Sequence, residues 1–534
     1  MSDFEITVKD FEDAIDDLSV NSAAGPDGFP AILLKKCKGA LIPSLVAIWR
    51  KSLDHGFIDP LMKTAFITPI YKGQDKTQPK NYRPIALTSH LIKVFEKLVR
   101  KQLVKYLEEN NFMNPTQHGF RTGRSCLSQL LEHYENIVRE LVAGNDVDVI
   151  YLDFSKAFDK VDHSVVLKKL SNFKIGGKIG KWLYTFLTNR TQSVVVAGHK
   201  SNPAPVRSGV PQGTVLGPVI FLVLISDIDK NVHNSFVSSF ADDTRMGRAV
   251  MNTADCESLQ NDMNAVYRWS DESNMEFNET KFEALHYGKN MDPGAVHVYK
   301  TASNLPIERK TTVKDLGVLM DDNGEFSSHV NATIDKTKRL SSWILRTFAA
   351  RDNKTMMTLW KALVVPILDY CSQLWSPLGI GRIQELEHIQ KSFTRRVEEM
   401  SDLNYWQRLQ KLKLYSLERR RERYQILYMY KILEGVVPNG LGIQSFTNAR
   451  RGRFISIPDF RALPNKKIEK LRDTRFSVRA ARLFNCLPKH LRDASDLSVS
   501  RFKSLLDAWL ATVPDQPQSA GYRNESGSNS LLLI

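Results

Sequence analysis

The stretch Ser238–Met246, SSFADDTRM, sets two neighbouring carboxylates, Asp242 and Asp243, directly after an aromatic-rich apolar run. The pattern around them predicts a β-hairpin that carries both aspartates. Two acidic residues in a turn are often no more than a solvated loop. At the tip of an apolar strand they can also hold a cation, because neighbouring like charges repel each other until a counter-charge neutralises them.

A third carboxylate, Asp153, ends the strongly β-forming segment 146–155, DVDVIYLDFS. A lone aspartate at a strand end usually serves as a turn or a helix cap, and we interpret Asp159 in that structural way. If two strand ends of one sheet bring Asp153 close to Asp242 and Asp243, the oxygen ligands would favour hard ions, above all Mg²⁺. Two such ions about 3.5–4 Å apart would suit an in-line phosphoryl displacement. The residues alone are therefore compatible with phosphoryl or nucleotidyl transfer.

The order of helical and strand-like segments predicts an α+β fold. Strands are expected at 65–72, 146–155 and 191–198, and helical periodicity dominates beyond about residue 330. This order predicts a mixed β-sheet with helices on one face, followed by a helical arm. The arm contains the basic run ERRRER (418–423), which we expect to be a solvated helix face.

Charge is distributed unevenly along the 534 residues, whose formal net charge is +15. Residues 1–330 hold 39 Lys and Arg against 40 Asp and Glu, whereas residues 331–534 hold 35 against 19. A neutral part joined to a basic part suggests a catalytic body with an arm that holds a polyanion, although a basic surface without a partner has the same composition. From about Pro514 the chain is rich in Gln, Ser, Gly and Asn and is predicted to be disordered.

Composition also excludes several classes of protein. The five cysteines form no CxxC pair, which argues against a disulfide framework or a zinc module. The longest apolar run, 215–225, is too short to span a bilayer, so no membrane partner is expected. The acidic N-terminus resembles neither a signal nor a transit peptide. We expect an intracellular protein of the cytoplasm or the nucleus.

Three motifs carry a resemblance to a known family. YLDFSKAFDKVDH (151–163), SGVPQGTVLGP (208–218) and FADDT (240–244), in this order, resemble motifs A, B and C of a reverse transcriptase. The form is that of non-LTR (LINE-type) retrotransposons, in particular the jockey-like branch. Further segments resemble the same group and extend the resemblance over nearly the whole chain: 23–30, 67–99, 117–126 (QHGFRTGRSC), 278–289, 314–321, 363–377, 386–397, 414–427 and 482–506.

The resemblance implies a right-hand polymerase fold. The reverse transcriptase core would cover residues 1–320, with fingers at about 1–145 and a palm with an antiparallel sheet at about 146–320. An all-α thumb at 321–435 and a basic C-terminal region at 436–513 would follow, before the disordered tail at 514–534. We expect most aromatic residues of the thumb to be helix core rather than base-stacking platforms.

The resemblance also implies roles for individual residues. Asp153 and Asp242 would hold two metal ions, Asp243 would complete the acidic cluster, and the backbone carbonyl of Phe154 would complete the coordination of a metal. Phe158 falls where the family places an aromatic that excludes the 2′-hydroxyl of a ribonucleotide; its alternative role is a helix-face core residue.

Other matched positions would contact the substrates. Gln212 and Gly213 would contact the incoming nucleotide and the template, and glycine permits close backbone approach. Arg83 and Lys72 would meet the triphosphate, a role that suits a guanidinium because it bridges phosphate oxygens in two-pronged fashion. Two further residues are matched less closely: Lys281 would protonate the pyrophosphate leaving group, and Arg121 would either order the fingers or contact the nucleic acid template.

The implied activity is that of an RNA-directed DNA polymerase. Template RNA, a DNA primer with a free 3′-hydroxyl and dNTPs would be its partners, and two Mg²⁺ ions, or Mn²⁺ as a substitute, its cofactors. A different class of function, a catalytically inactive relic that binds RNA, stays open. A group II intron maturase fits less well, because no maturase-type C-terminal signature is found. No endonuclease precedes the polymerase motifs, so we interpret the chain as the polymerase part of an element.

Overall fold

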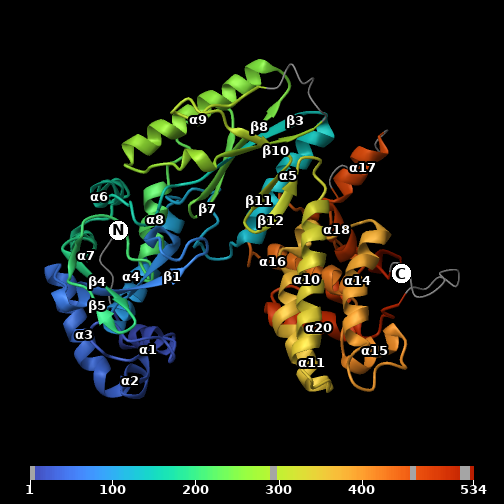
Figure 1. Ribbon diagram of the computed structural model, residues 1–534, viewed down its shortest axis with the longest axis horizontal. Helices are drawn as coiled ribbons and strands as arrows, with labels where there is room; N and C mark the ends of the chain where they lie inside the picture. Colours follow the sequence, from blue (N-terminus) through green and yellow to red (C-terminus); the bar gives the residue numbers. More distant parts are fainter. Residues whose placement is uncertain (1–5, 289–296, 458–464, 517–528, 534) are drawn as a thin grey trace.

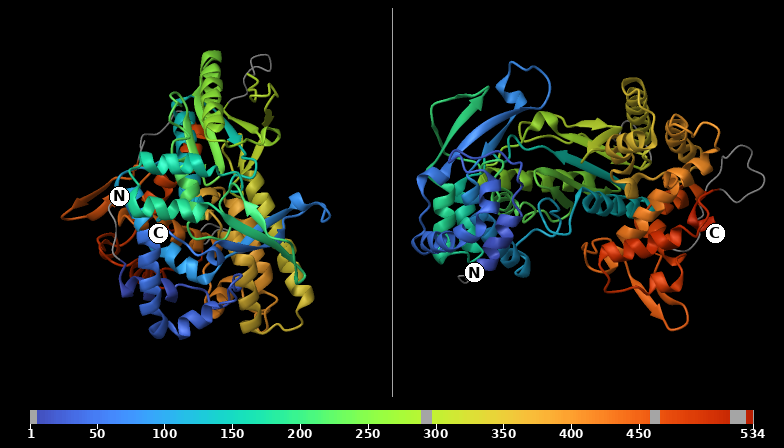
Figure 2. Two further views of the ribbon diagram at one scale, coloured as in Figure 1. Left: turned by 90° about the vertical axis from the view of Figure 1, so that its left-hand side faces the viewer. Right: turned by 90° about the horizontal axis from the view of Figure 1, so that it is seen from below.

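The computed structural model describes residues 6–288, 297–457, 465–516 and 529–533. A lobe of helices and a small sheet from the first part of the chain and a helical lobe from the last part are bridged by a central β-sheet (Figure 1). Figure 2 shows the same two lobes from the side and from below. Among the described residues, no helix has the length and apolar character needed to cross a membrane.

The central sheet has five strands in the order β10-β9-β3-β8-β7. Neighbouring strands are antiparallel except β9 and β10, which are parallel. The register pairs Leu152, the last residue of β3, with Thr244 at the start of β8. The residues just beyond Leu152 therefore lie beside the tip of the β7–β8 hairpin. The bounds of the strands are β3 (Asp146–Leu152), β7 (Phe236–Phe240), β8 (Asp243–Val250), β9 (Glu283–Tyr287) and β10 (Glu308–Lys310).

Helices cover both faces of this sheet, so the prediction of helices on one face is wrong. On β3, Val147 and Val149 pack with α5 (Cys126–Ala143) in the same core as the helical lobe. Ile150 and Leu152 point the other way and share a core with α8 (Gly217–Ile225) and α9 (Thr253–Glu272). The physical reason is that β3 is apolar on both faces, which is typical of a strand that is buried on both sides.

The N-terminal lobe contains a second sheet, whose hairpins project from it (Figure 2). Strand β1 pairs with β2 on one side and with β4 on the other, and β4 also pairs with β5 and β6. Ring contacts among Trp49, Phe95 and Trp182 join three of its helices. The elements are β1 (Thr64–Tyr71), β2 (Tyr82–Leu87), β4 (Arg190–Val196), β5 (His199–Lys200), β6 (Ala204–Val206), α1 (Val8–Asp16), α2 (Ala31–Lys36), α3 (Lys38–His55), α4 (His90–Glu109), α6 (His163–Asn172), α7 (Gly177–Leu187) and α8.

The hairpin β11 (Thr312–Asp315) and β12 (Val318–Asp321) leads from the central sheet into the helical lobe. The predicted helical arm is present, with one further hairpin, β13 (Ser445–Asn448) and β14 (Gly452–Ile455). Its helices are α10 (Ser327–Thr347), α11 (Asn353–Leu359), the π-turn Trp360–Val364, α12 (Val365–Asp369), α13 (Ser372–Trp375), α14 (Ile380–Thr394), α15 (Tyr405–Leu412), α16 (Leu417–Leu433), α17 (Lys466–Asp473), α18 (Phe476–Asn485), α19 (Lys489–Arg492) and α20 (Val499–Leu510).

Burial in this lobe confirms one expectation and corrects another. Trp360, Trp375 and Tyr405 are buried as helix core, whereas Trp343 is exposed. The basic run 418–423 is not a solvated face, because Arg419, Arg421, Glu422 and Arg423 are all buried. Helix α16 lies at the centre of the lobe, in contact with α13, α14, α18 and α20, so its charged side chains are covered from several directions.

The end of the chain also differs from the expected disorder of 514–534. Residues 517–528 and 534 lie outside the described residues. The segment 529–533, in contrast, packs on α16: Leu531 is buried, and its backbone amide donates to Oε2 of Glu422 at 3.0 Å. The amide of Asn529 donates to Glu418 at 2.9 Å. Polar composition alone missed this because the partners are supplied by carboxylates on α16, far from this segment in the sequence.

Candidate active site

The two aspartates of FADDT lie on a tight hairpin. Strands β7 and β8 pair up to Phe240 and Asp243, so Ala241 and Asp242 form a two-residue turn. Ala241 adopts the left-handed conformation with φ of 57°, as short hairpin turns require. Asp242 is half-buried at the tip of the turn, and Asp243 is exposed at the first position of β8.

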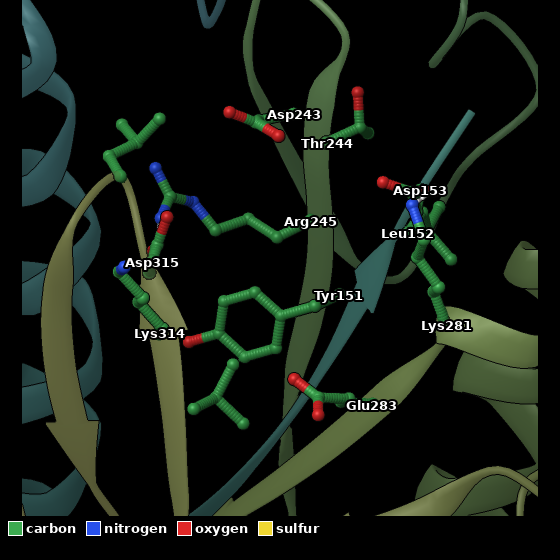
Figure 3. Close-up of a pocket in the computed structure, with 12 residues that line it drawn as sticks. Tyr151, Leu152, Asp153, Asp243, Thr244, Arg245, Lys281, Glu283, Lys314 and Asp315 are labelled. Carbon is green, nitrogen blue, oxygen red and sulfur yellow. Dashed lines mark hydrogen bonds and ion pairs between the residues drawn. The ribbon is translucent and has the colours of Figure 1, made fainter. Parts of the chain in front are cut away.

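Asp153 lies beside this tip, one residue after the end of β3. Its carboxylate Oδ2 accepts a hydrogen bond from Nζ of Lys281 at 2.9 Å, and its backbone carbonyl accepts one from the amide of Asn278 at 2.7 Å. Figure 3 shows Asp153 and Lys281 on one side of a cavity, Asp243 at the head of β8, and Asp315 of β11 opposite. This cavity has a volume of about 170 Å³.

The three carboxylates form one electrostatic group. Burial raises the pKa of Asp242, and the neighbouring Asp153 charge raises it further. Partial removal from water and the charges of Asp242 and Asp153 likewise raise the pKa of Asp243. Arg83 and Lys72 act on Asp242 in the opposite sense, so these two cations of the N-terminal lobe lie within electrostatic range of the turn.

The donor set suits a hard divalent ion. All three side chains offer oxygen, and their mutual repulsion is relieved when a cation binds. Among the described residues, no three His, Cys, Asp or Glu side chains are grouped closely enough to hold a metal ion by themselves. Mg²⁺ commonly binds through only one or two carboxylates, with waters and substrate phosphates completing its shell, so the residues present fit such an ion when substrate is bound.

Arg83 and Lys72 belong to the β1–β2 hairpin of the second sheet. Arg83 pairs with Ile70 across the hairpin, and Lys72 follows the end of β1. Both side chains are exposed, and within the described part of the chain neither has a hydrogen-bond or ion-pair partner. They are therefore free to meet an anionic ligand next to Asp242.

The PQG turn packs between the two sheets. The backbone carbonyl of Gln212 accepts a hydrogen bond from the amide of Ala86 at 2.7 Å. The side-chain Nε2 of Gln212 donates to Oδ1 of Asp159 at 3.0 Å. Gly213 has φ of 121°, and a Cβ there would lie 2.6 Å from the carbonyl oxygen of Ala86. Only glycine therefore suits this position, and Asp159 has the structural role that the sequence indicated.

Phe158 and Phe154 contribute apolar rings. Phe158 is half-buried and stacks on Phe221 of α8, with ring centroids 4.5 Å apart. Its other edge meets Phe120. Phe154 is buried and stacks on Phe277 at 4.5 Å. These contacts give Phe158 a core contribution, and the side chain is also partly exposed.

Arg121 is engaged within the N-terminal lobe. Its Nε donates to Glu108 of α4 at 2.8 Å, and Nη1 donates to the carbonyl of Asn114 at 2.6 Å. The side chain is 8% exposed. These contacts favour the first of its two proposed roles, ordering of the chain, over contact with nucleic acid.

Sequence reasoning missed the buried ion pair between Arg245 and Asp315. The pair ties β8 to the β11 hairpin at the edge of the cavity (Figure 3). Arg245 follows the second aspartate by two residues and therefore lies on the same face of β8 as Asp243. No clear signal for this pair was present in the sequence, because β8 also carries Thr244 and a second arginine, Arg248.

Comparison with known proteins agrees with this geometry. Residues 72–320 match the family described as "Reverse transcriptase (RNA-dependent DNA polymerase)". The match contains all three carboxylates, the PQG turn and the central sheet. The chain carries a reverse transcriptase domain. Its mixed sheets and helices form the right-hand polymerase fold that the motifs implied.

The reverse transcriptase domain has relatives among mobile elements. The chain is 25% identical over 420 residues to the probable RNA-directed DNA polymerase from transposon BS of Drosophila melanogaster, which covers 76% of this chain and 45% of that protein. It is 26% identical to the probable RNA-directed DNA polymerase from transposon X-element of the same fly, a match that covers 71% of this chain and 42% of that protein. It is 25% identical to the RNA-directed DNA polymerase from mobile element jockey, also of this fly, a match that covers 73% of this chain and 44% of that protein.

These comparisons confirm the resemblance to jockey-like non-LTR elements. The chain spans less than half the length of the curated relatives it matches. A solved structure, apo telomerase from Candida tropicalis truncated from its C-terminal domain, is 10% identical and gives a TM-score of 0.37 over 52% of this chain and 59% of that one.

Proposed function

We propose that the chain is an RNA-directed DNA polymerase that extends a DNA 3′-hydroxyl along an RNA template with dNTPs. The observation that carries the proposal is the cluster of Asp153, Asp242 and Asp243 at adjacent strand ends, inside the segment that matches the reverse transcriptase family. The implied division into fingers at about 1–145, palm at about 146–320 and thumb at 321–435 is part of this proposal. We also propose that it acts in the cytoplasm or the nucleus, where its RNA and DNA partners would be found.

The carboxylates would hold Mg²⁺, with Mn²⁺ as a substitute. Asp153 and Asp242 would be the main ligands, with Asp243 and the carbonyl of Phe154 as further ones. Bound divalent ions would neutralise the charge that builds up on the attacking and leaving oxygens. We also propose that Lys281 leaves Asp153 to donate a proton to the leaving pyrophosphate, a role for which its exposed position beside the cluster is suited.

The remaining residues orient the substrate. Arg83 and Lys72 would bind the triphosphate through charge-assisted hydrogen bonds, since they face the turn without partners among the described residues. Gln212 and Gly213 would line the path of nucleotide and template. The exposed edge of Phe158 would fill the space that a 2′-hydroxyl needs, so that deoxynucleotides are preferred.

Primer extension on poly(rA)/oligo(dT) tests the activity. We expect cDNA synthesis with Mg²⁺, none with EDTA, and none by Asp242→Ala. Asp271→Ala, which removes an exposed aspartate from α9, is the matched control and should retain activity. Robust synthesis by Asp242→Ala would refute the metal assignment. Absence of synthesis by a folded wild-type protein that binds RNA would favour the inactive RNA-binding alternative.

A second assay tests Phe158. Phe158→Ala should raise incorporation of rNTPs relative to dNTPs, because the ring no longer fills the space beside the sugar. Phe173→Ala removes another half-buried ring, stacked on Phe112 away from the carboxylates, and should leave the ratio unchanged. An unchanged ratio in Phe158→Ala would show that the ring is only part of the core.

A further inference from the structure

The turn that presents Asp242 is held by an amide side chain from a distant part of the chain. Oε1 of Gln117 accepts a hydrogen bond from the amide of Ala241 at 2.8 Å. Nε2 of the same side chain donates to the carbonyl of Ala241 at 3.3 Å. Both polar groups of the residue directly before Asp242 are thus satisfied by one side chain, 124 positions earlier in the sequence.

Backbone contacts fix the relative position of the two segments. The amide of His118 donates to the carbonyl of Ser239 at 2.9 Å, and the amide of Ser239 donates to the carbonyl of Thr116 at 3.2 Å. Gly119 lies so close that a Cβ would be 2.4 Å from the nitrogen of Ala241. The amide of Gly119 also donates to Oε1 of Gln117 at 2.7 Å, which orients the side chain toward the turn.

Ala241 needs such support for two reasons. Its φ of 57° is a conformation that L-residues adopt only at an energetic cost. It is also 5% exposed, so water cannot readily replace a lost hydrogen-bond partner, and a buried unpaired polar group is unfavourable. Gln117 is itself 4% exposed. Without its amide, the turn would lose the contacts that favour this conformation over others.

We propose that Gln117 is a positioning residue, which acts on metal binding and catalysis by holding the Ala241–Asp242 turn in its strained form. The proposal rests on the proposed function of the carboxylate cluster. An amide is required because it accepts from one backbone group and donates to another. A glutamate at this position could not donate to the carbonyl of Ala241, and would add a negative charge beside three carboxylates.

The proposal predicts effects that are separate from loss of folding. In the full-length protein, Gln117→Ala should speed hydrogen exchange of the peptide 238–244 by about tenfold, because the Ala241 amide loses its acceptor. It should also weaken Mn²⁺ binding, measured by electron paramagnetic resonance without nucleic acid, by about tenfold. In primer extension, kcat should fall by about 10–100-fold and KM for the dNTP should change by less than about threefold, because Asp242 is displaced rather than lost.

Two further variants sharpen the test. Gln117→Glu should weaken activity at least as strongly as Gln117→Ala. The double variant Gln117→Ala/Ala241→Gly should have a kcat at least about threefold higher than Gln117→Ala alone, because glycine adopts positive φ without the cost that alanine bears.

The matched control is Gln390→Ala. Gln390 is also a buried glutamine, and its Nε2 donates to Tyr405 at 3.0 Å and to the carbonyl of Tyr415 at 2.9 Å, within the helical lobe. Its removal should lower stability without changing exchange at 238–244 or Mn²⁺ affinity.

Unchanged exchange and unchanged Mn²⁺ affinity in folded Gln117→Ala would overturn the proposal. The same changes in Gln390→Ala would also overturn it, because they would then reflect general destabilisation. Wild-type protein that does not extend a primer would refute the proposed function, but exchange and Mn²⁺ binding would still decide whether Gln117 holds the turn.

Discussion

At the edge of the central sheet, Asp153, Asp242 and Asp243 lie at the ends of β3 and β8. The pKa values of Asp242 and Asp243 are raised by partial removal from water and by the charge of Asp153. Glu135 of α5, which packs against the helical lobe, is more deeply buried but has a full set of donors. Its carboxylate accepts from Nε of Arg475 at 2.8 Å, and from the amide and hydroxyl of Ser477 at 2.7 and 2.9 Å.

The two groups of carboxylates differ in whether the protein itself supplies their hydrogen-bond and ion-pair partners. A buried carboxylate that meets a guanidinium and a helix N-terminus is satisfied within the protein. The carboxylates of Asp153, Asp242 and Asp243 are only partly satisfied, with Lys281 on Asp153, and favour an added cation. The contrast between internally paired and partly satisfied carboxylates can be tested by measuring the free energy of unfolding of single variants.

The largest effect is expected for the Glu135–Arg475 pair, whose side chains are 2% and 4% exposed. Glu135→Ala leaves the guanidinium buried without its carboxylate and should lower the free energy of unfolding by about 3–5 kcal/mol. Urea denaturation measures the change. Asp13→Ala removes one partner of a surface pair with Lys9 and should cost less than about 1 kcal/mol. Similar losses for both variants would contradict the contrast.

A pH-dependent effect is expected at Glu422 of α16. Burial raises the pKa of this carboxyl to about 8, so between the ordinary glutamate pKa and pH 8 the folded state binds more protons than the unfolded state. Stability should therefore fall as pH rises through this window, on the order of a few kcal/mol. Glu387, whose pKa burial raises to about 7, adds to the same trend.

Glu422→Gln should flatten this dependence and raise stability at pH 8, because the neutral amide has no proton to lose. Thermal unfolding between pH 5 and pH 8 measures both effects. Glu109→Gln, at an exposed position at the end of α4, should leave the slope unchanged. An unchanged slope in Glu422→Gln would mean that other groups, such as Glu387, control it.

A gain in stability is expected when the carboxylate of Asp242 is neutralised. Because the pKa of Asp242 is raised, its ionised form disfavours the folded state at pH 7, and Asp242→Asn should raise the melting temperature in EDTA. Mg²⁺ should stabilise the wild type, by about 2.7 kcal/mol at 100 times Kd, and should stabilise Asp242→Asn much less. Equal Mg²⁺ shifts in the two proteins would place the metal elsewhere.

The smallest effect is expected for Lys281→Met. The Lys281–Asp153 pair is largely exposed, with side-chain exposures of 62% and 35%, and such pairs contribute about 0–1 kcal/mol. Lys178→Met, which removes the lysine of another exposed pair with Asp54, should show a change of the same size. A loss above about 2 kcal/mol in Lys281→Met alone would mean that Asp153 depends on this lysine for its place in the fold.

Much of the site was predictable from local sequence. The apolar run before Asp153 and the hairpin around Asp242 and Asp243 follow from strand periodicity, and their order along the chain matched a known set of motifs. The glycine of PQG was expected to allow close approach of nucleotide or template, which stays a prediction; what the structure shows is a close approach of Gly213 to the backbone of Ala86. These features are local, because each depends on the alternation of residues along a strand or on the conformational freedom of one residue.

Only the tertiary structure decided how distant segments meet. Periodicity does not reveal that both faces of β3 are covered, that ERRRER lies in the centre of a helical lobe, or that Arg121 is engaged by Glu108. It does not show that Gln117 satisfies the backbone of Ala241. Burial and hydrogen-bond partners are set by contacts between residues far apart in the chain, so the same charged or amide side chain can be solvated, structural or functional according to what packs against it.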